Sequence, residues 1–194
     1  MVIGITGGVG SGKSAVLNYL NTEYSYRIIK ADEVANYLKL RGNACYDALI
    51  KLLGEDIIGE NLEIDNFKMA SKIFSSNNLL ENTNKIIHPE VKKYILSEID
   101  KKDYEIIFIE AALLIEDCYL PYLDELWYIY ACEDIRIGRL IDSRGYSLDK
   151  VKGIMEKQMS DDEFRSYADY VIDNSYDIKE TFRQIDARLR EYRL

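Results

Sequence analysis

The stretch Gly7-Gly8-Val9-Gly10-Ser11-Gly12-Lys13-Ser14 decides the fold. Its pattern, G-x-x-x-x-G-K-S, is typical of a loop that binds the phosphates of a nucleotide. Backbone N–H groups can surround phosphate oxygens closely only where no Cβ intervenes, which explains the high glycine content. The residues that we assign to ATP binding are Gly8, Gly10, Ser11, Gly12, Lys13, Ser14 and Ala15.

The segments on both sides of this loop agree with that interpretation. The apolar run Val2-Ile3-Gly4-Ile5 predicts a short buried strand, and a helix is predicted to begin near Lys13 and to continue to Leu20. The positive end of such a helix favours anions. Lys13 is expected to bring a mobile charge to the β- and γ-phosphates, and the Ser14 hydroxyl is the expected Mg²⁺ ligand.

Composition limits the remaining possibilities. A length of 194 residues suits one compact core with a smaller insert. The net charge of −9 argues against a general nucleic-acid binder. The longest apolar runs are too short to span a membrane, and Met1 leads directly into the first predicted strand, so no signal peptide is expected. We expect a cytoplasmic protein that is a monomer or a weak homo-oligomer.

The three cysteines indicate neither a metal site nor a disulfide framework. Cys45, Cys118 and Cys132 are odd in number and lack C-x-x-C spacing. We therefore expect thiols, as in the reducing cytoplasm.

Further apolar segments alternate with helical patterns. Strands are predicted at 26–29, 105–109, 125–130 and 168–174, and an amphipathic closing helix at 178–194. Trp127 is expected in the core. This alternation predicts an α/β fold with a doubly wound, five-stranded parallel sheet, as in P-loop proteins.

The region between two of these strands is too long for a plain crossover. Residues 42–102 show helical patterns, so we interpret them as an inserted helical subdomain. Within it, His88-Pro89 is predicted to break the chain, with Pro89 opening a helix that runs to Ile99. We predict one unit with its core at 1–41, 103–132 and 166–194, this insert at 42–102 and a small helical segment at 133–165.

Two acidic residues follow predicted strands. Asp32 is placed to face the phosphates, because ligands bind at the carboxyl ends of parallel strands, but it would equally suit the N-cap of a helix over 33–40. Glu110 closes the third strand, where an acid usually completes the Mg²⁺ shell. The alternative for Glu110 is a helix-capping or solvated carboxylate.

A basic cluster and a single histidine complete the set of candidate residues. Arg136, Arg139 and Arg144 are candidates for a guanidinium clamp on the transferred phosphoryl group, with a solvated helix face as the alternative. A helix is predicted after them, from about Ser147 to Met159. His88 is either a structural hydrogen-bonding residue or a contact to substrate.

In their order along the chain, these motifs resemble dephospho-coenzyme A kinases. The resemblance covers nearly the whole chain, and its most specific parts are Ile87-His88-Pro89-Glu90-Val91 and Ala168-Asp169-Tyr170-Val171-Ile172-Asp173-Asn174. The other matching residues are the P-loop, Ala31-Asp32, Leu113-Leu114, Arg139-Leu140 with Arg144, and Gln158.

This resemblance implies ATP-dependent phosphorylation of the ribose 3′-hydroxyl of dephospho-coenzyme A, which gives coenzyme A. It implies Asp32 as the catalytic base, Lys13 and Ser14 as phosphate and Mg²⁺ ligands, and His88 in the substrate-binding region. It also implies one kinase unit, in which the insert at 42–102 is a helical substrate-binding subdomain and residues 133–165 form a small helical lid that contains Arg139 and Arg144.

Several residues depart from the usual pattern of that family. The family usually has an acid in place of Lys30, arginines in place of Asn36 and Asn66, and Asp-Ile-Pro in place of Glu110-Ala111-Ala112. The alternatives are therefore another P-loop small-molecule or nucleoside kinase, or a relative that binds without turnover. A nucleotide-driven switch is a third class, although Asn84-Lys85-Ile86-Ile87 lacks the Asp of the guanine-reading motif.

Overall fold

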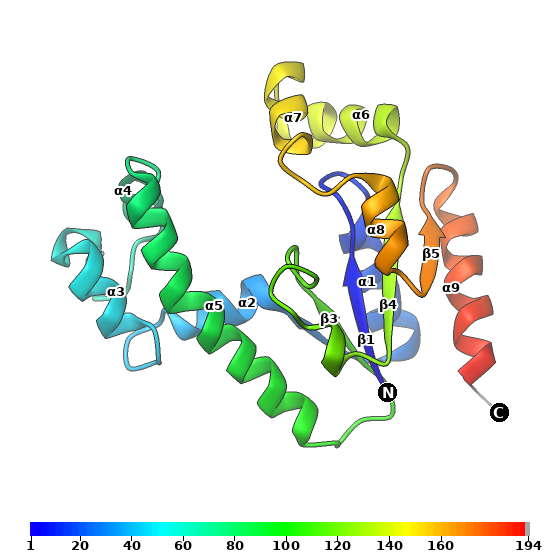
Figure 1. The fold of residues 1–194 in the computed structure, drawn as a ribbon, viewed down its shortest axis with the longest axis horizontal. Helices are drawn as coiled ribbons and strands as arrows, with labels where there is room; N and C mark the ends of the chain where they lie inside the picture. The colour runs from blue at the N-terminus through cyan, green and yellow to red at the C-terminus, as the bar shows by residue number, and fades with distance from the viewer. Residues whose placement is uncertain (193–194) are drawn as a thin grey trace. The chain divides into compact units, whose positions relative to one another are not determined.

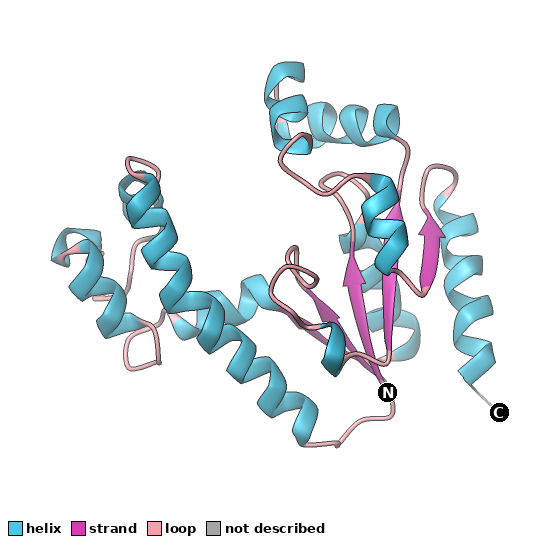
Figure 2. Cartoon of the chain, in the orientation of Figure 1, coloured by secondary structure: helices cyan, strands magenta, loops and turns pink. Residues whose placement is uncertain are grey.

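The computed structural model describes residues 1–192 and contains a five-stranded parallel sheet in the order β2-β3-β1-β4-β5 (Figures 1 and 2). The strands are β1 (Val2–Thr6), β2 (Arg27–Lys30), β3 (Ile107–Glu110), β4 (Glu125–Tyr130) and β5 (Tyr170–Asp173). The α-helices are α1 (Lys13–Tyr24), α2 (Ala31–Leu38), α3 (Tyr46–Leu53), α4 (Asn66–Ile73), α5 (Asn77–Asp100), α6 (Glu133–Arg144), α7 (Leu148–Met155), α8 (Asp161–Tyr167) and α9 (Ile178–Tyr192). The predicted α/β fold is confirmed.

The chain forms two compact units. One comprises residues 1–28 and the described residues from Tyr104 onward, and the other comprises Ile29–Asp103. The second unit begins before the predicted insert at residue 42, because α2 packs against α5.

Both faces of the sheet are covered within the first unit. On one face, α1 and α9 pack against apolar side chains of β1, β3, β4 and β5, and Trp127 is fully buried there, as predicted. On the other face α8 packs against β4 (Figure 1). The Phe164 ring of α8 is stacked there on Tyr128, at a centroid distance of 4.9 Å. The central strand β1 is paired with β3 on one side and β4 on the other, and the glycine-rich loop leaves from its carboxyl end.

The second unit corrects one expectation. The sequence predicts a break at His88-Pro89, but α5 is a single helix of 24 residues with Pro89 inside it. A proline there removes the hydrogen bond to the carbonyl of Lys85, at a cost of roughly 3 kcal/mol or more. Packing offsets this cost: α2, α3 and α4 all pack on α5, which buries Val91 and Ile95.

The segment after α6 also differs from its prediction. The helix predicted from Ser147 to Met159 is the shorter α7, followed by turns and then by α8. Two serines explain the division, since Ser147 and Ser160 each accept a hydrogen bond from a backbone N–H at the start of α7 and α8. The closing helix is described to Tyr192, and the last two predicted residues lie outside the described part. Between residues 1 and 192, no helix is long and apolar enough to cross a membrane.

Candidate nucleotide-binding site

The glycine-rich loop runs from the end of β1 to the start of α1, as predicted. Gly10 and Gly12 have φ angles of 79° and 93°, in the left-handed region that favours glycine. A Cβ on Gly12 would lie only 2.1 Å from Asn174 Nδ2. Glycine at position 12 is therefore required both by its backbone conformation and by a close neighbour.

The start of α1 fits an anionic ligand. Lys13 Nζ donates a hydrogen bond to the Gly7 carbonyl at 2.6 Å, which places the ammonium group against the loop. Ser14 and Ala15 are exposed in the first turn, and that turn contains no acidic side chain. The positive end of the helix is thus not neutralised by an acidic side chain of its own first turn.

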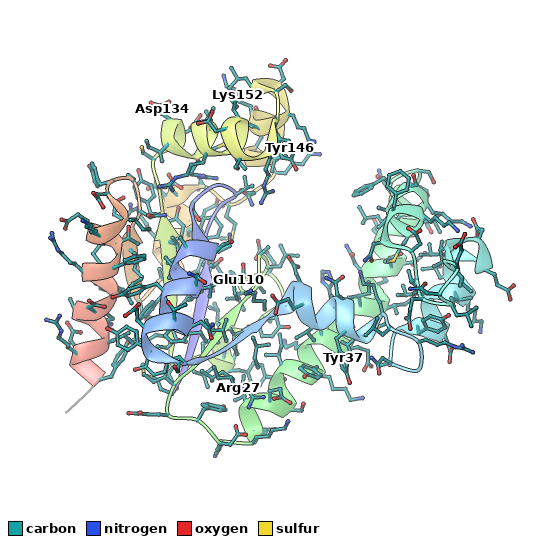
Figure 3. All side chains as sticks on the ribbon, turned by 180° about the vertical axis from the view of Figure 1, so that it is seen from behind. Arg27, Tyr37, Glu110, Asp134, Tyr146 and Lys152 are labelled. Carbon is teal, nitrogen blue, oxygen red and sulfur yellow. The ribbon has the colours of Figure 1, made fainter. Side chains whose placement is uncertain are left out.

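Glu110 lies beside the strand that carries the loop. Glu110, labelled in Figure 3, is the last residue of β3. The register pairs it with Ile5 of β1, one residue before β1 ends at Thr6. The segment that follows Glu110 forms turns, so the helix-capping alternative is wrong.

The protein residues near the loop suit Mg²⁺ that arrives with a nucleotide. The hydroxyl of Ser14 and the carboxylate of Glu110 are oxygen donors, the type that Mg²⁺ prefers. Among residues 1–192, no group of three or more His, Cys, Asp or Glu residues could hold a metal ion by itself. Mg²⁺ usually binds through one or two protein groups with the remaining ligands from phosphates and water, and the donor set fits that mode.

The arginines divide into two kinds. Arg136 is buried and donates from Nε to the Val9 carbonyl at 3.0 Å, while Arg139 donates from Nη1 to the Ser11 carbonyl at 3.3 Å. For these two the solvated-face alternative is wrong, because their guanidinium groups hold the loop. Arg144 is exposed at the last residue of α6, with its guanidinium 5.9 Å from the Tyr146 ring centroid.

Two residues that sequence reasoning left without a role contact the loop directly. Asn174 is 1% exposed and donates from Nδ2 to the Ser11 carbonyl at 2.7 Å. Gln158 accepts the Val9 N–H at 2.9 Å. A signal for Asn174 was available, because it directly follows a strand of a parallel sheet. Gln158 comes from the turns between α7 and α8, and no local pattern marks it.

Asp32 and His88 lie in the unit Ile29–Asp103. Asp32 is exposed in the first turn of α2, and Lys30 occupies the N-cap, so the N-cap alternative is wrong. His88 is half-buried within α5 rather than in a loop. The functions of both residues stay predictions.

A lysine of the same unit contacts one of the positions that departs from the family pattern. Lys39 donates from Nζ to Asn66 Oδ1 at 2.9 Å. Burial lowers the pKa of the Lys39 ammonium, against the opposing effect of the Asp32 carboxylate. The chain therefore places a half-buried amine beside Asn66.

The fold and the loop together define a P-loop nucleotide-binding protein, in which a strand, the G-x-x-x-x-G-K-S loop and a helix follow one another within a parallel sheet. Residues 1–180 match the model of the dephospho-CoA kinase family. The chain belongs to that family, whose members are kinases.

Relatives and solved structures agree with this assignment. A dephospho-CoA kinase of Streptococcus mutans is 35% identical over 191 residues, which is 97% of this chain and 96% of the relative. The crystal structure of TT1252 from Thermus thermophilus superposes with a TM-score of 0.81 at 27% identity, over 98% of this chain and 97% of that one. A dephospho-CoA kinase from Campylobacter jejuni shares the fold, with a TM-score of 0.75 at 18% identity, over 98% of this chain and 96% of that one.

Proposed function

We propose that this chain transfers the γ-phosphoryl group of ATP to the ribose 3′-hydroxyl of dephospho-coenzyme A, the last step of coenzyme A synthesis. The bond between the γ-phosphorus and the bridging oxygen of ADP breaks, a bond to the 3′-oxygen forms, and the hydroxyl proton leaves. The observation that carries the proposal is the family match over residues 1–180, on a chain whose P-loop is intact.

In this proposal the nucleotide end of the reaction uses the loop and the start of α1. Backbone N–H groups of the loop and the Lys13 ammonium bind the phosphates. Ser14 and Glu110 would hold Mg²⁺, which neutralises phosphate charge when it is bound. Support comes from the exposed position of Ser14 in the first turn of α1 and from the register that pairs Glu110 with Ile5.

The acceptor end is assigned to the unit Ile29–Asp103. We assign Asp32 as the general base that accepts the proton of the 3′-hydroxyl, and His88 to the binding of dephospho-coenzyme A. This assignment of Asp32 is supported by its exposed side chain and by its position two residues after the end of β2. The division into a core, an insert at 42–102 and a lid at 133–165 belongs to the same proposal, with the lid excluding water that would otherwise hydrolyse ATP.

We assign Arg144 to stabilisation of the charge on the transferred phosphoryl group, because its exposed side chain is available to a ligand. Arg139 instead acts through the loop that it holds.

A transfer assay tests the reaction. Purified protein is mixed with Mg-ATP and dephospho-coenzyme A, and coenzyme A is measured by mass spectrometry, with Lys13→Met as the inactive control. Nucleosides and small sugars replace the acceptor in parallel reactions. Coenzyme A formation that requires Lys13 supports the proposal. Phosphorylation of another acceptor while dephospho-coenzyme A stays unchanged contradicts the substrate. ATP hydrolysis without any acceptor would indicate a switch, and binding without transfer a non-catalytic relative.

We also propose that the chain acts in the cytoplasm. In the described structure Cys45, Cys118 and Cys132 are thiols and form no disulfide, which supports a reducing compartment.

A further inference from the structure

Two side chains from the segment 133–165 converge on a single residue of the phosphate loop. Gln158 Oε1 accepts the N–H of Val9 at 2.9 Å, and Arg136 Nε donates to the Val9 carbonyl at 3.0 Å. Arg136 Nη2 also donates to Gln158 Oε1, at 3.4 Å. Both backbone polar groups of Val9 are therefore held by side chains that are themselves joined.

The guanidinium of Arg136 is fixed from a third direction. The Arg136 side chain is 8% exposed, and its Nη1 lies 3.5 Å from Asp161 Oδ1. The same carboxylate oxygen accepts a hydrogen bond from the Tyr128 hydroxyl on β4 at 2.6 Å. A buried guanidinium is stable only when its charge and its N–H groups are matched, and Asp161, Gln158 and Val9 provide those partners. The central sheet thus supports the position of Arg136.

The loop packs directly on this arginine. A Cβ on Gly8 would lie 2.2 Å from Arg136 Nη2 and 2.6 Å from its Cζ. The absence of a side chain at position 8 therefore lets the loop lie against the Arg136 guanidinium. This is a second reason for glycine there, besides the close approach of a phosphate to the loop backbone.

We propose that Arg136 and Gln158 are positioning residues for nucleotide binding. They hold the Val9 peptide, and through it they orient the N–H groups of the following loop residues for the phosphates. The N–H of Val9 is donated to Gln158, so it serves the loop and not a phosphate oxygen. Only the turnover measurements of this inference rest on the proposed function. The binding measurements do not, because ATP can bind without the phosphoryl acceptor.

The test compares variants of Gln158 in the full chain. Gln158→Met keeps the length but removes the acceptor, whereas Gln158→Glu keeps an acceptor oxygen for Val9. The dissociation constant of Mg²⁺ with a non-hydrolysable ATP analogue is measured by calorimetry, and the melting temperature alongside it. We expect about 10-fold weaker binding in Gln158→Met, the size of a lost buried hydrogen bond, and near wild-type binding in Gln158→Glu. Lys157→Met, a change at the exposed neighbouring residue, should bind normally.

Turnover adds a second readout. In the transfer assay, Gln158→Met should raise the KM for ATP and leave the KM for the acceptor unchanged, because only the phosphate loop is disturbed. Arg136→Lys keeps the charge beside Asp161 but loses the paired donation to Val9 and Gln158, so it should weaken nucleotide binding in the same way.

Two results would overturn the inference. One is wild-type nucleotide affinity in both Gln158→Met and Arg136→Lys. The other is equal impairment of Gln158→Met and Gln158→Glu, which would show that the acceptor oxygen is not what matters. If Gln158→Met fails to fold, Arg136→Lys alone decides. Failure of the wild type to phosphorylate dephospho-coenzyme A, with these binding differences intact, would count against the proposed function and not against this inference.

Discussion

The side-chain amide of Asn174 donates a hydrogen bond to the Ser11 carbonyl at 2.7 Å and so joins the end of β5 to the phosphate loop. Asn174 is held in turn, because its Oδ1 accepts the Thr181 hydroxyl of α9 at 2.8 Å. Arg139 adds a donation from Nη2 to the Asn174 carbonyl at 2.8 Å. The conformation of the loop therefore depends on residues from the other end of the chain and not on the glycine-rich motif alone.

Removal of the Asn174 side chain should affect both stability and nucleotide binding. Asn174→Ala leaves the buried Thr181 hydroxyl without its acceptor and takes one donor from the Ser11 carbonyl. We expect the free energy of unfolding to fall by about 1–3 kcal/mol, the cost of an unmatched buried polar group. Urea denaturation measures it, with Asn18→Ala on the exposed side of α1 as the control, expected to change by less than about 0.5 kcal/mol. Equal effects of the two variants would contradict the expectation.

Gly12 should tolerate no side chain. Gly12→Ala combines a positive φ of 93° with a Cβ placed 2.1 Å from Asn174 Nδ2. Gly42 is a matched control, since its φ is 86° but a Cβ there meets nothing within 4 Å. We expect Gly12→Ala to abolish measurable binding of an ATP analogue, while Gly42→Ala costs only about 1 kcal/mol of stability through its backbone and binds normally. Wild-type binding by Gly12→Ala in calorimetry would show that Asn174 can move aside.

The elements of the sheet were predictable because short apolar runs between helical patterns have few other interpretations. Glu125–Tyr130 agrees with its prediction to the residue. The motif also predicted the start of α1 at Lys13, since loop and helix form one unit.

What the sequence could not predict depended on packing across the chain. Pro89 lies inside α5 because three helices pack on that helix, and a local reading of His88-Pro89 contains none of those contacts. The solvated-face alternative for Arg136 and Arg139 failed for the same reason: charge spacing on a helix does not show which face meets the P-loop. Gln158 could not be recognised as a loop partner, because its contact with Val9 spans 149 positions.

Arg139 and Arg144 should behave differently when they are replaced. Arg139 makes hydrogen bonds to the carbonyls of Gly10, Ser11 and Asn174, so Arg139→Ala should lower both the melting temperature and kcat. Arg144 is exposed, so Arg144→Ala should leave stability within about 0.5 kcal/mol. If it stabilises the transferred phosphoryl group, its loss should lower kcat on the order of 10²–10³-fold. Thermal denaturation and the transfer assay distinguish the effects of the two variants. Unchanged turnover in Arg144→Ala would show that Arg144 is only a solvated surface residue.

Glu125 should contribute to stability in a pH-dependent way. Burial alone would raise the pKa of the Glu125 carboxyl, but hydrogen bonds from Tyr192, Trp127 and Arg188 outweigh it, and the pKa is lowered. A carboxyl with a lower pKa in the folded state stabilises the protein above its unfolded-state pKa, and this contribution is lost as the pH falls through the folded-state pKa. Unfolding free energies of the wild type should therefore drop more steeply on acidification than those of Glu125→Gln.

The control for this measurement is Glu81→Gln, which removes one carboxylate from an exposed site on α5. Urea titrations between about pH 3 and pH 7 cover the range in which carboxylates become protonated. If the unfolding free energies of the wild type and Glu125→Gln fall in parallel as the pH is lowered, the contacts of Glu125 do not favour its charged form.

Asp32 and Glu110 both follow strands, but the proposed function gives them different tasks, and a pair of isosteric variants separates these tasks. Asp32→Asn removes the base without changing side-chain size. Because Lys30 and not Asp32 occupies the N-cap of α2, stability and ATP affinity should stay close to those of the wild type. The value of kcat should fall by roughly 10²–10⁴, the usual contribution of a positioned general base.

Glu110→Gln should instead raise the Mg²⁺ concentration that is needed for half-maximal activity, because the site next to Ile5 loses a negative charge while its oxygen remains. At saturating Mg²⁺ the variant should recover most of its turnover, since the carboxylate takes no proton in the proposed reaction. Titration of Mg²⁺ at fixed ATP, repeated for both variants, decides between the assignments. If Asp32→Asn changes only the Mg²⁺ requirement, and Glu110→Gln stays inactive at saturating metal, then Glu110 is the base and Asp32 belongs to the metal shell.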